Sequence, residues 1–147
     1  MIKELFAPGR DSALTSFGLL ILRVWLGLAI FFNHGLDKLS HFNIYESKFP
    51  DPLGIGVVPG LALVTCAETA GALLLALGLL TRFAALTLVI DLAVAVFLVH
   101  KAAHGPGELA FVYLAGYAAL MIAGGGRFSL DQAVFGKGAS GAQSKRG

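Results

Sequence analysis

The sequence contains little cysteine and little charge. Its 147 residues include one cysteine, Cys66, and only 14% are charged. A single cysteine excludes an intramolecular disulfide, a CxxC redox pair and a zinc site built on cysteine pairs. We interpret Cys66 as a small packing residue, because a free cysteine is commonly buried and inert.

Several motifs that define enzyme classes are also missing. The sequence has no Walker phosphate loop, no GxGxxG in a strand context, no HExxH and no triad spacing. Its basic residues are scattered without interleaved aromatic residues, and the net charge is only +2, so we expect no nucleic-acid partner. We therefore predict no metal site, and no residue can be assigned as catalytic from its motif.

What the sequence does contain is apolar residues, which make up 56% of the chain and give a mean hydropathy of +0.78. This balance leaves too little polar cover for a soluble domain and is typical of a membrane protein. The first apolar run, residues 16–35, is longer than the core of a signal peptide, and no A-x-A cleavage site follows it. We therefore expect this run to remain as a membrane helix.

Four apolar runs predict an all-α fold, namely a four-helix transmembrane bundle with both termini cytoplasmic. Roughly 20 residues cross the hydrocarbon core, and the predicted helices span residues 16–36, 57–80, 83–100 and 108–124. The bundle occupies residues 16–126. A cytoplasmic or interfacial segment, 1–15, precedes it, and a cytoplasmic tail, 127–147, follows it. We expect the end of the tail, from residue 138, to be disordered.

The orientation follows from the basic residues near the helix ends. One side of the predicted bundle carries seven: Lys3, Arg10, Arg82, Arg127, Lys137, Lys145 and Arg146. The other side carries three: Lys38, Lys48 and Lys101. Because cytoplasmic loops carry the excess of lysine and arginine, both termini are predicted inside, and the long connection at 37–56 is predicted outside.

Three ionisable residues fall near mid-depth in the predicted helices: Arg23, Glu68 and Asp91. A charge at the bilayer centre costs about 2.5–3.5 kcal/mol on insertion scales, so these side chains should face the bundle interior. We expect Arg23 to face Glu68 and to share this contact with Asp91. The acid in excess of the cation is expected to stay neutral, because desolvation disfavours its charged form.

Two interpretations of this buried polar site remain open. In the first, the three charges only specify which helix packs against which. In the second, they form a proton path or anchor a polar head group such as a quinone carbonyl.

A second polar group is predicted at the outer rim of the bundle. It comprises His34, Lys38, His100 and Glu108. Two helix-borne histidines across a bundle can ligate haem iron, but capping or hydrogen bonding is the commoner role for interfacial histidine. Haem is therefore disfavoured as a cofactor.

Three longer segments form a more specific pattern. They are LRVWLGLAIFFNHGLDKL, ETAGALLLALGLLTRFAAL and GELAFVYLAGYAALMIAGGGRFSLD, and they cover nearly all of residues 22–131. Together they resemble the DoxX family of small four-helix membrane proteins. The residues that match its motifs are Arg23, His34, Gly35, Lys38, Glu68, Gly71, Thr81, Arg82, Ser129 and Asp131.

The resemblance implies a multi-pass protein of the bacterial inner membrane. That family includes, or is related to, subunits of a thiosulfate:quinone oxidoreductase, and other members are tied to oxidative stress and thiol redox complexes. For this chain it suggests a redox-linked subunit with a quinone as cofactor and a redox protein as partner, besides the lipid bilayer and a second copy of the chain. If the chain takes part in catalysis, it does so as an oxidoreductase subunit.

The alternative is a membrane scaffold or assembly factor without catalysis, whose buried charges only specify helix packing. A carrier of protons or small solutes is weaker, because no inverted repeat is visible in the sequence.

Overall fold

All regular structure in the part of the chain that the structure describes is helical. In this computed structural model, residues 13–99 and 107–136 are described. The first rod, Ala13–Ser40, comprises α2 (Ala13–Ile30), the π-helical turn η1 (Phe31–Gly35) and α3 (Leu36–Ser40). The further segments are α4 (Phe42–Glu46), α5 (Val57–Cys66), η2 (Ala67–Gly71), α6 (Ala72–Leu77), α7 (Thr81–Val94), η3 (Ala95–Val99), α8 (Glu108–Ala123) and α9 (Leu130–Phe135).

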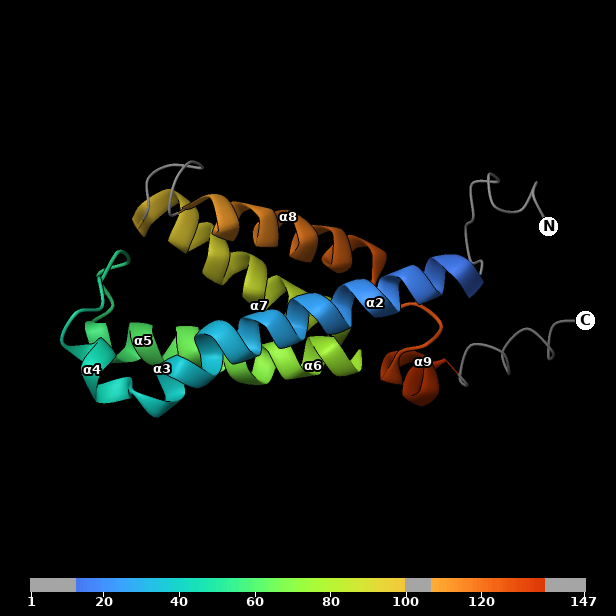
Figure 1. Cartoon of the computed structure of the whole chain (residues 1–147), viewed down its shortest axis with the longest axis horizontal. Coiled ribbons are helices and arrows are strands. Elements are labelled where there is room, and N and C mark those ends of the chain that lie inside the picture. The colour runs from blue at the N-terminus through green and yellow to red at the C-terminus, as the bar shows by residue number, and fades with distance from the viewer. Residues whose placement is uncertain (1–12, 100–106, 137–147) are drawn as a thin grey trace, which may run out of the picture.

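The rods run alternately up and down the molecule. Figure 1 shows α2 alongside α6, and α7 alongside α8, and these pairs are in contact. We call the end that carries α3, α4 and residues 47–56 the loop end. We call the end that carries the α6–α7 turn, residues 78–80, and α9 the tail end. The polar clusters described below lie at these two ends.

Within residues 13–99 and 107–136, three helices are long and apolar enough to cross a membrane. They are Ala13–Ser40, Val57–Leu77 and Thr81–Val99, with 28, 21 and 19 residues. Their most apolar windows are only 22%, 28% and 28% buried inside the protein. Most of each helix therefore presents apolar side chains outward, which suits a lipid surrounding. The helix Glu108–Ala123 is also apolar but shorter.

The core lies where α2, α6, α7 and α8 meet. Its buried members are Ile30, Ala72, Leu75, Ala84, Ala85, Leu88, Leu92, Tyr117 and Leu120. Tyr117 is the one with a hydroxyl, and this group donates a hydrogen bond of 2.9 Å to the carbonyl of Leu26. A buried tyrosine hydroxyl needs such a partner, and this bond fixes α8 against α2.

The first helix continues further than the sequence pattern predicts. It runs on through Gly35 to Ser40, because Gly35 adopts a helical φ of −64° and no proline follows before Pro50. The long connection also contains α4, and α9 lies in the region predicted as a tail. Residues 1–12 and the predicted disordered end from residue 138 lie outside the described residues.

Candidate functional site

Arg23 is buried at the tail end, where it binds backbone carbonyls. Its Nη1 donates to the oxygen of Ala76 at 2.7 Å, and its Nη2 donates to the oxygen of Phe128 at 2.5 Å. The last carbonyls of a helix have no partner within that helix, and Ala76 lies in the last turn of α6. Gly78 packs against the guanidinium with a φ of +72°, so a side chain there would meet Arg23. Arg23 thus joins α2, α6 and the segment before α9.

The expected pairing of Arg23 with Glu68 is wrong. Arg23 lies level with Ala76, and Glu68 precedes Ala76 by eight residues on the neighbouring rod. At about 1.5 Å per residue this separates them by about 12 Å along the helix axis, beyond the reach of an arginine side chain. The three predicted mid-membrane charges therefore do not meet, because Arg23 lies at the tail end while Glu68 and Asp91 lie near the middle of their rods.

Asp131 completes the tail-end cluster. Its carboxylate accepts hydrogen bonds from the backbone N–H groups of Leu80 and Thr81, at 2.6 and 2.9 Å. These are orphan donors at the beginning of α7. Burial raises the pKa of Asp131, but the hydrogen bonds from Thr81 and Leu80 and the charge of Arg23 outweigh it and hold that pKa below its usual value. The cluster ties the segment that begins α9 to the α6–α7 turn.

Glu68 forms an ion pair with Lys38 near the loop end. Lys38 Nζ lies 2.5 Å from Glu68 Oε2, and the two side chains are 13% and 7% exposed. Both charges are thus largely removed from solvent. A pair of this kind requires good geometry, because the cost of desolvating two charges is comparable with their attraction.

Two π-helical turns bring this pair together. Glu68 lies in η2, and Lys38 follows η1 by one turn of α3. Gly35, at the end of η1, packs so closely on the backbone of Glu68 that a Cβ atom there would collide with the Glu68 carbonyl. Turns of this type are frequent at functional sites, and here they turn both side chains toward the same space.

That space is a cavity of about 670 Å³ between the α5–η2–α6 rod and the α7–η3 rod, reaching η1 and α8. Its walls are mainly apolar. Its ionisable and aromatic polar side chains are His34, Lys38, Asp51, Cys66, Glu68, Asp91 and Tyr113. We call it the loop-end cavity. A largely apolar chamber with a few polar groups is the usual form of a small-molecule site.

Asp91 reaches this cavity from the last turn of α7, near the middle of the Thr81–Val99 rod. Its Oδ2 atom is buried and has no hydrogen-bond partner among the described residues. A buried polar group without a partner costs free energy and calls for an explanation. An unpaired carboxylate would cost more than the neutral acid, so the burial of Oδ2 favours the neutral form of Asp91.

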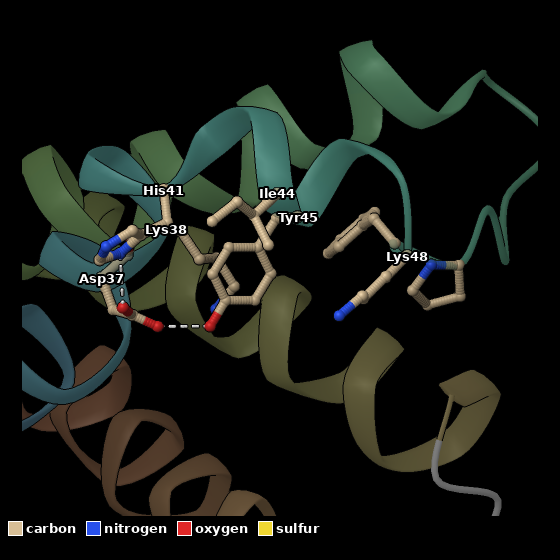
Figure 2. A pocket seen from close by; sticks show the side chains of 8 residues that line it. Asp37, Lys38, His41, Ile44, Tyr45 and Lys48 are labelled. Atoms are coloured by element: carbon tan, nitrogen blue, oxygen red, sulfur yellow. Dashed lines mark hydrogen bonds and ion pairs between the residues drawn. The ribbon is translucent and has the colours of Figure 1, made fainter.

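A second, exposed hollow of about 570 Å³ lies beside the cavity at the loop end. Figure 2 shows Asp37 held between Tyr45 and His41, with Lys38 and Lys48 nearby. The hydroxyl of Tyr45 donates to Asp37 Oδ2, and His41 Nδ1 lies 2.9 Å from Asp37 Oδ1. The bond to Asp37 raises the pKa of Tyr45. Lys38 lines both spaces.

The predicted outer rim is only partly assembled. His34 and Lys38 both line the cavity. Glu108 is exposed in the first turn of α8, outside the lining, and His100 lies outside the described residues. Within residues 13–99 and 107–136, no group of three or more histidine, cysteine, aspartate or glutamate side chains could hold a metal ion.

Two features of the site escaped the sequence analysis. The sequence marked Lys38 as a rim residue and not as the partner of Glu68. The Asp37–Tyr45 contact also went unnoticed, although the two residues lie eight apart in a chain segment rich in polar and aromatic residues. In addition, Cys66 is exposed at the cavity edge, so the prediction of a packing role is wrong.

Comparison with known proteins adds a family and one relative. A model of the DoxX family matches residues 18–101, which is more than half of the chain. An uncharacterized protein of Haemophilus influenzae is 34% identical over 118 residues, which cover 74% of this chain and 84% of that protein. No solved structure matches the chain significantly.

Proposed function

Because the chain belongs to the DoxX family of membrane proteins, we propose that its loop-end cavity binds the head group of a membrane-soluble quinone within a redox-linked complex. One observation carries the proposal. Among the described residues the buried Oδ2 of Asp91 has no partner, and Asp91 lines the same apolar chamber as the Lys38–Glu68 pair. A ligand that is apolar along its length and accepts hydrogen bonds at its head would satisfy both features.

The size and lining of the cavity suit such a ligand. Small-molecule sites have volumes of about 300–1,000 Å³, and this cavity has about 670 Å³. Side chains such as Leu63, Leu74 and Ile90 supply an apolar wall for an isoprenoid tail. The exposed fractions of Leu63 and Ile90 are 64% and 56%, so this wall continues onto the outer apolar surface of the rods, from which a lipid-soluble molecule would enter.

The polar residues would have distinct tasks. A neutral Asp91 would donate a hydrogen bond to one quinone carbonyl oxygen, and that would satisfy its orphaned atom. The Lys38 ammonium, oriented by Glu68, would offer a second donor. A bound quinone would supply the ability to take up or release two electrons and two protons.

The orientation of the protein in the membrane follows from the distribution of its basic residues. By the excess of basic residues at the tail end, we place that end and both termini in the cytoplasm of a bacterium, with the loop end on the outer side of the inner membrane. We further propose that α8 completes a four-helix bundle. Electrons would pass between the quinone and a partner redox protein, and a second copy of the chain is a further candidate partner.

Quinone that copurifies with the protein in mild detergent tests this function. After extraction, mass spectrometry should find quinone in the wild-type protein and about tenfold less in Asp91→Ala, the effect of losing one hydrogen bond worth about 1.4 kcal/mol. Asp91→Ala should fold normally, because Asp91 Oδ2 has no protein partner among the described residues. Lys48→Met, an exposed change in the neighbouring hollow, serves as the matched control. Wild-type protein with no more quinone than empty micelles would refute the proposal.

The competing function is a scaffold without catalysis. The Arg23 and Asp131 contacts favour it, because they only join structural elements. A scaffold predicts that Asp91→Ala leaves quinone content and complex assembly unchanged. The two functions therefore differ in the outcome of the same extraction.

A further inference from the structure

Lys38 stands at the boundary between the loop-end cavity and the exposed hollow. On the cavity side, its Nζ lies 2.5 Å from Glu68. On the other side, the same Nζ lies 6.0 Å from the centroid of the Tyr45 ring, and Lys38 lines the hollow that contains Asp37. A lysine has a flexible four-carbon stem, so its charged end can move between the two carboxylates.

The carboxylate on the outer side of Lys38, that of Asp37, is partly exposed to solvent. The side chain of Asp37 is 46% exposed and that of its partner His41 is 54% exposed. By contrast, the side chain of Glu68 is 7% exposed. Lys38 therefore lines one space with a carboxylate inside the protein, that of Glu68, and another with a carboxylate at its surface, that of Asp37.

Asp91 lies at the inner end of the series of ionisable side chains that leads from Asp37 through Lys38 and Glu68. Asp91 and Glu68 line one cavity, and its volume of about 670 Å³ exceeds by far the ~30 Å³ of one water molecule. The other titratable groups that face the space are His34 on η1, Cys66 on α5 and Tyr113 on α8, with Asp51 from the connection. Ionisable side chains thus extend from the last turn of α7 to the surface hollow.

We propose that these residues form a proton route between the loop-end cavity and the loop-end surface, with Lys38 as its gate. Its purpose rests on the proposed function, since a quinone that is reduced must take up protons. When Asp91 has given its Oδ2 proton to the ligand, a proton from the loop-end solvent binds a carboxylate oxygen of Glu68. The neutral Glu68 releases Lys38, which moves toward Asp37.

Glu68 then passes the proton to the Asp91 carboxylate, and Lys38 returns to the ionised Glu68. Each transfer breaks one O–H bond and forms one, and Lys38 keeps its three N–H protons throughout. The net change is one proton taken from solvent and one carboxylate of Asp91 neutralised. The tail end takes no part, because Arg23 and Asp131 are occupied with backbone groups.

Hydrogen–deuterium exchange of the Asp91 carboxyl group tests the route without any quinone. The protein in quinone-free nanodiscs is transferred to D₂O, and the infrared carbonyl band that Asp91→Asn removes is followed with time. In the Lys38→Met/Glu68→Leu double variant, which removes the relay without leaving a charge unpaired, exchange should slow by about a hundredfold, the scale on which a positioned proton donor changes a rate. Asp37→Asn should slow it less, because Lys38 then loses its outer partner.

Lys48→Met is the matched control, since Lys48 lines the same hollow but forms no part of the Lys38–Glu68 pair, and it should leave the exchange rate unchanged. Equal exchange in the wild type and the double variant would overturn the proposal, as would the absence of any carbonyl band that depends on Asp91. Quinone binding is measured separately by extraction. Failure of the route therefore leaves quinone binding intact, and failure of quinone binding leaves the exchange measurement unaffected.

Discussion

Replacing Lys38 with methionine is expected to lower the free energy of unfolding by about 3 kcal/mol, because removal of one partner leaves a buried charge uncompensated. Glu68, of which 5% is exposed in the unchanged protein, loses its cation in this variant. The Lys38→Met/Glu68→Leu double variant should recover stability to within about 1 kcal/mol of the wild type, since apolar replacement of a buried pair is often neutral. Unfolding of the protein in mixed micelles titrated with dodecyl sulfate, followed by circular dichroism, provides the measurement.

Lys48→Met is again the control. As an exposed substitution it should change the free energy of unfolding by no more than about 0.5 kcal/mol. If the double variant loses as much stability as the Lys38→Met and Glu68→Leu single variants together, the two side chains are not coupled. Such a result would show that the Lys38–Glu68 ion pair does not stabilise the protein.

Replacing Arg23 with methionine is expected to cost about 3–5 kcal/mol, since hydrogen bonds to charged groups contribute about 1.5–3 kcal/mol each and Arg23 donates two to backbone carbonyls. The largest local effect should appear in the segment that Phe128 and Asp131 anchor. There, amide hydrogen exchange measured by mass spectrometry should accelerate. Quinone content should stay at the wild-type level, because Glu68, on the polar side of the cavity, lies about 12 Å further along the rods.

Arg82→Met is the matched comparison for Arg23→Met. The guanidinium of Arg82 is exposed and donates one hydrogen bond of 3.3 Å to the carbonyl of Ile122, so its loss should have little effect on either exchange or stability. Loss of quinone in Arg23→Met protein that is still folded would contradict the division into two separate clusters. It would instead favour a direct link between Arg23 and Glu68.

Local properties of the sequence predicted the helices well. Length and hydropathy decide whether a segment can span a membrane, and they pointed to the three long helices that the structure contains. The family resemblance was also correct. The sequence change at Asp37 from apolar to polar indicates a helix end, whereas the helical backbone continues to Ser40 and breaks at His41, where φ is −120°.

Contacts between helices could not be predicted in the same way. Arg23 and Glu68 looked like partners because each lies near the middle of an apolar run. Their true partners depend on the axial register of two rods and on a free carbonyl at the end of α6, and neither is a local property of the sequence. The resemblance did mark Gly35, Ser129 and Asp131, but only the structure gives them roles: close packing on Glu68, the cap of α9 by Ser129, and the cap of α7 by Asp131.

The most direct test of the central claim is a density map of the protein purified in mild detergent with its native lipids. The claim is that Asp91, Lys38 and Glu68 serve a ligand in an apolar chamber. We predict density for a flat head group within hydrogen-bond distance of Asp91 Oδ2, and a tail that leaves the chamber along Leu63. A chamber closed by side chains, with Asp91 bonded to another residue of the protein, would contradict it.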